Sequence, residues 1–92
     1  MSKAVWPGDK WVGSETGKVS RSDDGRVVLS LSLRYAMPET WNTVLFVYGP
    51  EGCSDERQGW FELMTVGSFE EAVARIKKIA LAADLITSQT VN

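Results

Sequence analysis

The chain has 92 residues, a formal net charge of −2 at pH 7, no histidine and a single cysteine, Cys53. A chain of this length forms one small core, so we expect residues 1–92 to fold as a single domain. Imidazole is the commonest general acid–base group near neutral pH and the commonest metal ligand. Its absence removes most routes to catalysis and metal binding. The near-neutral charge argues against a strongly basic nucleic-acid-binding protein.

Neither a membrane-spanning helix nor a secretory signal is expected. No apolar run approaches the roughly 18–20 residues that a membrane-spanning helix needs. The opening residues MSKAVWP lack the apolar core of a signal peptide. A lone cysteine excludes an internal disulfide. We therefore expect a protein of the reducing cytoplasm that does not bind a membrane.

In chain order, the first expected element is a short edge strand within the N-terminal segment 1–16, at about Trp6–Val12. A proline and a glycine interrupt it, which suits an edge position. Next we expect a hairpin of two strands, at about 17–22 and 27–34, joined by the Asp-Asp-Gly turn at 23–25. Apolar and polar residues alternate in the second of these strands, which predicts one buried face.

Two further strands are predicted at Thr40–Tyr48 and Trp60–Val66, separated by a polar loop through Gln58. The first of them is apolar at both alternating sets of positions. This pattern is typical of a central strand that is covered, at least in part, on both sides.

The last predicted element is a helix over about Phe69–Leu85. Ser68 and Glu71 have the spacing of a capping box, in which each side chain bonds the other residue's backbone N–H. Apolar residues recur at helical spacing along it, and we expect that stripe to pack on the leucine face of the 27–34 strand. The polar tail 87–92 is expected to fray. The stripe is expected to bury Phe69, Val73 and Ile76 against Leu29, Leu31 and Leu33.

These elements predict an α+β domain: an antiparallel meander of three to five strands with one C-terminal helix packed on one face. One helix cannot hide both faces of such a sheet. The uncovered face is expected to carry Arg34, Phe46 and Tyr48, together with whichever of Trp41 and Trp60 points outward.

Catalytic and metal-binding patterns are absent from the sequence. The adjacent carboxylates at 23–24, 55–56 and 70–71 have neither metal-ligand nor paired acid–base spacing, and Cys53 has no histidine to activate it. We therefore expect no enzyme activity, no metal and no cofactor.

Four tryptophans are many for so short a chain, and tryptophan and arginine dominate binding hot spots. Charge is also segregated, since bases outnumber acids over residues 1–34 and acids outnumber bases over 35–73. Trp6 and Trp11 lie in a glycine- and lysine-containing stretch and are expected to be the more exposed indoles. The predicted contact surface consists of Arg21, Arg26 and Arg34 with Trp6 and Trp11.

In size, in lacking histidine and cysteine chemistry, in aromatic content and in split charge, the chain resembles small phage- or mobile-element-encoded inhibitors of the anti-CRISPR type. The resemblance extends over the whole chain and includes no motif, so no functional residue is carried over from that family. It implies a non-catalytic protein of the host bacterial cytoplasm. Such a protein would occupy a surface of a CRISPR-type nucleoprotein complex and block target binding or nuclease recruitment.

Two other functions fit the sequence. One is a small nucleic-acid-binding module that contacts RNA or DNA through the basic hairpin. The other is an accessory subunit of a larger assembly. A combination is also consistent with the charge pattern, with the hairpin touching nucleic acid and the acidic middle of the chain touching protein.

Overall fold

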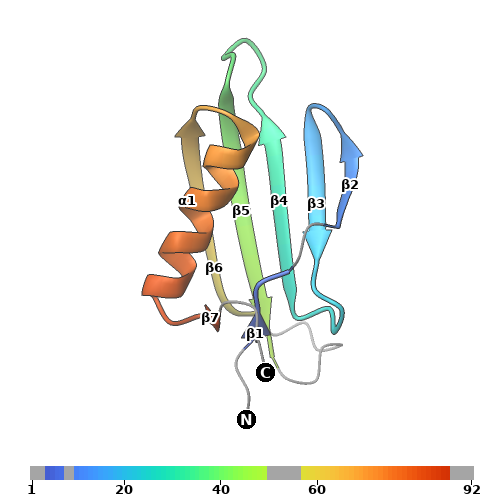
Figure 1. The fold of residues 1–92 in the computed structure, drawn as a ribbon, viewed down its shortest axis with the longest axis vertical. Helices are drawn as coiled ribbons and strands as arrows, with labels where there is room; N and C mark the ends of the chain where they lie inside the picture. The colour runs from blue at the N-terminus through green and yellow to red at the C-terminus, as the bar shows by residue number, and fades with distance from the viewer. Residues whose placement is uncertain (1–3, 8–9, 50–56, 88–92) are drawn as a thin grey trace.

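The computed structural model describes residues 4–7, 10–49 and 57–87, with the backbone alone at positions 57 and 58. In chain order, the described residues form the strands and helix shown in Figure 1. These are β1 (Ala4–Val5), β2 (Trp11–Ser14), β3 (Gly17–Arg21), β4 (Val27–Leu33), β5 (Thr40–Tyr48), β6 (Arg57–Val66), α1 (Phe69–Ala82) and β7 (Ile86–Thr87).

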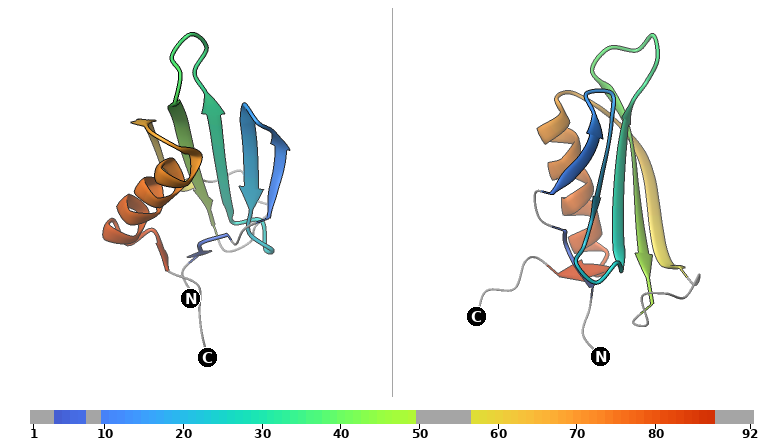
Figure 2. Two further views of the ribbon diagram at one scale, coloured as in Figure 1. Left: turned by 45° about the horizontal axis from the view of Figure 1, so that its top comes forward. Right: turned by 90° about the vertical axis from the view of Figure 1, so that its right-hand side faces the viewer.

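The main sheet is an antiparallel meander in the order β2-β3-β4-β5-β6, and α1 packs on one of its faces (Figure 2). This arrangement confirms the predicted α+β fold with a C-terminal helix. β5 has the predicted bounds, and β3 and β4 each end one residue earlier than predicted. β6 begins at Arg57, ahead of the predicted start at Trp60.

The β3–β4 turn is held by the side chain of Asp24. Its Oδ1 accepts hydrogen bonds from Ser22 Oγ at 2.7 Å and from the Arg26 N–H at 3.0 Å. These bonds, that from Ser22 first, lower the pKa of the Asp24 carboxyl below its ordinary value. Gly25 takes a φ of 75°, a conformation that glycine adopts without a steric penalty. The turn therefore sets the register in which β4 pairs with β3.

The helix begins with the predicted capping box. Glu71 N–H donates to Ser68 Oγ at 3.1 Å, and Ser68 N–H donates to Glu71 Oε1 at 3.0 Å. The helix ends at Ala82, three residues before the predicted end. Asp84 takes a φ of 64° and Leu85 N–H bonds back to Ala80 O at 3.1 Å, which closes the helix without the usual glycine.

The buried face of the sheet is continuous with the buried stripe of α1. Ile76 is fully buried, as predicted, whereas Phe69 and Val73 are only partly buried. The helix was predicted to lie over the leucines of β4, but it lies chiefly over β5 and β6. Leu29 and Leu31 are nevertheless fully buried and Leu33 is partly buried, because residues from both ends of the chain join the core. The contributors from the ends are Ala4, Trp6, Trp11, Leu85 and Ile86.

The N-terminal segment differs from the expected single edge strand. The edge strand is Trp11–Ser14, and the earlier residues form β1, which pairs in parallel with β7. Ala4 lies opposite Ile86, and Trp6 N–H donates to Thr87 O at 3.1 Å. Of the predicted fraying tail, Thr87 belongs to β7 and positions 88–92 lie outside the described residues.

Thr43 is fully buried on the core face, and its Oγ1 has no hydrogen-bond partner in the part of the chain that the structure describes. An unpaired buried hydroxyl costs about 1–3 kcal/mol. Thr43→Val keeps the shape and removes the hydroxyl, so we expect the free energy of unfolding in urea to rise by about 1 kcal/mol. Thr16→Val, at an exposed position, should change it by less than about 0.5 kcal/mol. A loss of stability in Thr43→Val would contradict this prediction.

The capping bond from Ser68 N–H lowers the pKa of the Glu71 carboxyl below its ordinary value of 4.5. Because the folded-state pKa is the lower one, this carboxylate stabilises the fold above pH 4.5, and the stabilisation is lost as pH falls through the folded pKa. Glu71→Gln should therefore reduce the free energy of unfolding more at pH 7 than at pH 3. Glu70→Gln is the control, since Glu71 alone bonds the cap N–H. An equal loss at both pH values would exclude the carboxylate effect.

Candidate functional site

The sheet has one face turned away from α1, β1 and β7, here called the open face (Figure 2). In the described ranges, no helix or strand lies over it. Directly opposed residues of neighbouring strands point to the same side of a sheet, so the register identifies its members. The members with side chains are Val12 and Ser14 of β2, Val19 and Arg21 of β3, Val28, Ser30 and Ser32 of β4, Thr40, Asn42, Val44, Phe46 and Tyr48 of β5, and Trp60, Glu62, Met64 and Val66 of β6.

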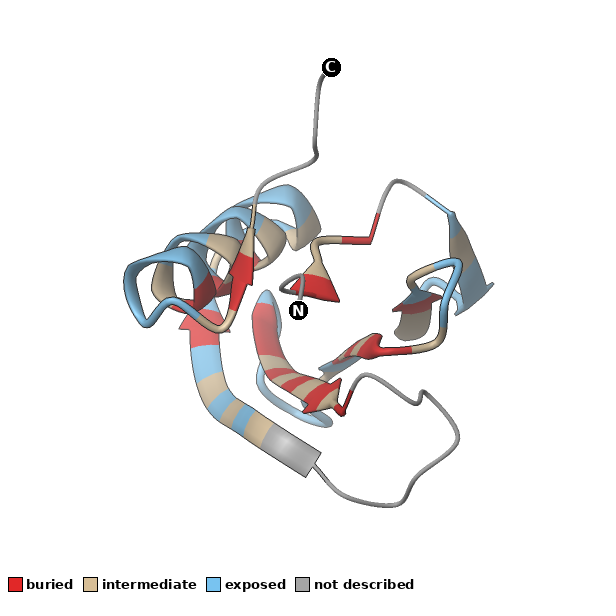
Figure 3. Ribbon diagram, turned by 90° about the horizontal axis from the view of Figure 1, so that it is seen from below, coloured by how far each residue is buried: buried red, intermediate tan, exposed pale blue. Residues whose placement is uncertain are grey.

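A row of aromatic rings crosses this face from β5 to β6. Phe46 lies directly opposite Trp60, with ring centroids 6.4 Å apart and planes inclined by 24°. Tyr48, two residues further along β5, stacks on Phe46 at 6.3 Å and 29°. Trp60 is 53% exposed, and burial alternates along β6 as Figure 3 shows. The open face thus presents an indole whose orientation is supported by a second ring.

A shallow hollow lies beside the aromatic row. Arg34, Asn42, Trp60, Glu62 and Met64 line it. Asn42 Nδ2 donates to Glu62 Oε2 at 3.2 Å across the β5–β6 pair. The hollow therefore combines an exposed arginine, an oriented amide–carboxylate pair and an apolar rim.

The structure does not bring the predicted arginines together. Arg21 and Arg34 are both exposed, but Arg21 pairs with Val28, and Arg34 lies six residues beyond Val28 on the β4 side. That separation is about 20 Å along a strand. Arg26 is only 8% exposed, and its Nε donates to Tyr48 O at 3.4 Å. Arg26 is thus largely a structural residue.

The exposure of the four tryptophan side chains differs from the prediction. Trp6 and Trp11, expected to be the more exposed indoles, are both partly buried on the core side. Trp11 contacts Phe69 edge to face at a centroid distance of 4.9 Å, and Lys77 Nζ lies 5.9 Å from the Trp6 ring centre. Trp41 is buried, and Trp60 is the exposed one.

Sequence alternation located part of the open face. Phe46 and Tyr48 lie there as expected, and the hollow places Arg34 beside it. The even-numbered residues of β6 were not singled out as a group. The signal for them was present, because Trp60, Met64 and Val66 alternate with residues that face the core. The sequence does not show how β6 pairs with β5, and that register is needed to assign these three residues to the open face.

The described residues hold no group of three or more histidine, cysteine, aspartate or glutamate side chains that could bind a metal. Cys53, with the acidic loop residues Glu51, Asp55 and Glu56, lies outside the described ranges. Within those ranges, no helix has both the length and the apolar character needed to cross a bilayer.

Comparisons of the chain with protein-family models, with curated proteins and with solved structures gave no match.

Because Arg26 is buried, we expect a charge reversal at this position to destabilise the fold. Arg26→Glu places a carboxylate in a site shaped for a guanidinium, so we expect the free energy of unfolding to fall by about 1–3 kcal/mol. Arg21→Glu, in the same hairpin but exposed, should change it by less than about 0.5 kcal/mol. Urea denaturation followed by tryptophan fluorescence measures both variants. Equal stability of the two variants would show that the burial of Arg26 contributes nothing to folding.

Proposed function

We propose that this chain is a non-catalytic binding protein that contacts a partner protein through the open face of its sheet. The observation that carries the proposal is the 53% exposure of Trp60, which stacks on Phe46 on an uncovered face of the sheet, at its β6 edge. Exposed apolar surface of this kind, rimmed by polar residues, is typical of interaction sites.

The composition of the open face favours protein over other partners. Tryptophan, tyrosine, phenylalanine, methionine and arginine are enriched at protein–protein interfaces, and lysine and glutamate are depleted there. Trp60, Phe46, Tyr48 and Met64 supply the first kinds, and Glu62 is the one carboxylate on this face within the described ranges. Since a strand and a neighbouring ring hold Trp60, ordering it on binding costs little entropy.

The resemblance to anti-CRISPR inhibitors suggests which partner to test first. In this form of the proposal, the open face docks on a protein subunit of a bacterial CRISPR-type nucleoprotein complex. Target DNA or a recruited nuclease is then excluded by occupancy of the surface. Such inhibition is stoichiometric, because the inhibitor acts only while it is bound.

A second candidate is nucleic acid, favoured by one specific feature of the same face. Exposed aromatic rings on a sheet can stack with unpaired bases. Arg21, in line with the row beyond Val28, and Arg34, in the hollow beside the row, could contact phosphates. Two exposed arginines about 20 Å apart form a weak phosphate track, which is why we place this function second.

The test is Trp60→Ser in a panel of purified CRISPR effector complexes, with target binding and cleavage measured as the protein is titrated in. We expect the wild type to inhibit at a near-equimolar ratio. The variant should need about 30-fold more protein, the scale of a hot-spot loss.

Leu81→Ser is the matched control, because it removes an exposed apolar side chain from α1, away from the open face. It should inhibit as the wild type does. If no complex in the panel responds to the wild type, the CRISPR form of the proposal fails. A salt-dependent affinity for a single-stranded oligonucleotide that is lost in Trp60→Ser would favour nucleic acid instead.

A further inference from the structure

The strand β6 forms one edge of the five-stranded sheet, and the direction of its free backbone groups follows from the register. Gly67 N–H donates to Glu39 O at 2.7 Å, one position beyond the β5–β6 pairs. Antiparallel pairs alternate between hydrogen-bonded and non-hydrogen-bonded positions, so odd-numbered residues of β6 turn their backbone groups toward β5. The groups that point to the free edge belong to Trp60, Glu62, Met64 and Val66.

Most of the features that protect sheet edges are absent from this strand. Edges are normally kept short, broken by proline or bulges, or lined with charges, lysine above all. β6 runs for ten residues, its sequence RQGWFELMTV has no proline, and the register shift is confined to its start, opposite Val47 and Tyr48. Along the free-edge residues the one charge is Glu62. Its neighbours are exposed apolar residues: Trp60 at 53%, Met64 at 42% and Val66 at 76%.

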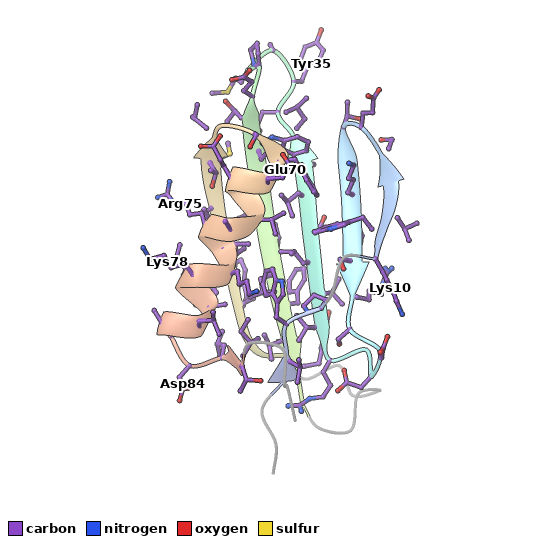
Figure 4. All side chains as sticks on the ribbon, in the orientation of Figure 1. Lys10, Tyr35, Glu70, Arg75, Lys78 and Asp84 are labelled. Carbon is purple, nitrogen blue, oxygen red and sulfur yellow. The ribbon has the colours of Figure 1, made fainter. Side chains whose placement is uncertain are left out.

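The flank of α1 above this edge carries two cations, Arg75 and Lys78, and one carboxylate, that of Glu71, which is bonded to the Ser68 N–H. Lys77 lies over the Trp6 ring on the flank of the helix that faces the N-terminal segment. Arg75 and Lys78 are exposed on the other flank, and Figure 4 shows both side chains directed past the β6 side of the molecule. A strand added to β6 would lie one strand spacing, about 4.8 Å, farther out. Its residues on the helix side would face these two cations.

We propose that β6 accepts an extended segment of a partner protein as a sixth strand of the sheet, and that acidic residues alternate with apolar residues in this segment. The acidic side chains would face Arg75 and Lys78. The apolar side chains would continue the open face beside Trp60, Met64 and Val66. Backbone pairing supplies affinity in such strand addition, and the alternating side chains supply specificity. This inference rests on the proposed binding function and adds the mode of contact and the chemistry of the partner.

A second copy of this chain fits the edge less well. Pairing β6 with β6 would bring a second helix to the same edge, with its own Arg75 and Lys78. Like charges brought together in this way oppose association. A separate acidic strand avoids that repulsion, which is the reason for choosing it.

Amide hydrogen exchange by NMR tests the edge directly. In the free protein, the N–H groups of Trp60, Glu62, Met64 and Val66 should exchange faster than those of their odd-numbered neighbours. The probe is a synthetic peptide of alternating valine and glutamate, as long as β6. At saturation it should slow exchange of these four amides by about tenfold or more. A peptide of alternating valine and lysine is the charge control and should bind more weakly.

Two sets of variants separate backbone pairing from charge. Met64→Pro removes an outward N–H without touching the β5 ladder, so we expect affinity for the valine–glutamate probe to fall about tenfold or more. Met64→Ala shortens the same side chain but keeps that N–H, so it should lose clearly less affinity than Met64→Pro. The double variant Arg75→Glu with Lys78→Glu should reverse the preference between the two probes. This reversal keeps the inference testable if Met64→Pro fails to fold.

Several outcomes would overturn the inference. They are unchanged exchange of the four amides at saturating probe, binding that Met64→Pro leaves intact, and an unchanged probe preference in the charge variant. Protection of these amides in the protein alone, rising with its concentration, would assign the edge to a second copy. If those overturning results are observed while Trp60→Ser still weakens binding to a partner protein, the proposed function stands and only the strand-addition mode is lost.

Discussion

The structure depends on covering one face of a five-stranded sheet with a single helix. α1 is narrower than the sheet and lies over β5 and β6, so the apolar face of β4 needs another cover. The chain supplies it with β1, β7 and the indoles of the N-terminal segment, all of which join the same buried cluster. Phe69 connects the two covers, because its ring contacts both Trp11 and Trp41 edge to face. Edge-to-face pairs of this kind add to the stabilisation from buried area.

Covering one face so fully leaves nothing in the described chain to cover the other. The uncovered face and the free edge meet at β6, which is also the strand that leads directly into α1. The capping box at Ser68 turns the chain back over the sheet immediately after Val66, so the helix covers the inner side of β6 and leaves its outer side exposed. The binding surface proposed for this protein is thus a consequence of where the helix begins.

Much of this fold could be predicted from the sequence, because its longer elements have strong local signals. The long apolar run in Thr40–Tyr48 is enough to define the strand, and the Ser68–Glu71 pair marks the helix start. The helix end was missed because Asp84 takes the left-handed conformation that glycine usually supplies. β1 and β7 have two residues each and pair only with one another, so no local pattern announces them.

The candidate site was harder to predict than the fold. Periodicity assigns residues to two faces of a strand but does not say which face the helix covers, so the outward position of Trp60 was left open. Arg26 follows a turn and carries a charge, both signals of exposure, yet it is buried beside Tyr48 O. Trp6 is next to a Pro-Gly pair and Trp11 follows Asp9 and Lys10, which are signals of a surface segment, whereas both indoles help to cover the part of the sheet that the helix does not reach. These placements depend on tertiary packing that local sequence does not encode.

The parallel pairing of Ala4 with Ile86 also bears on the order in which the protein folds. The four contacts along the meander join strands that follow one another in the chain, so each closes a short loop. Pairing β1 with β7 closes nearly the whole chain, and the entropy lost in closure grows with loop length. We therefore expect the β1–β7 contact to form after the hairpins of the meander. On this basis we expect the chain to fold from its middle outward, and its unfolding to begin with the separation of β1 from β7.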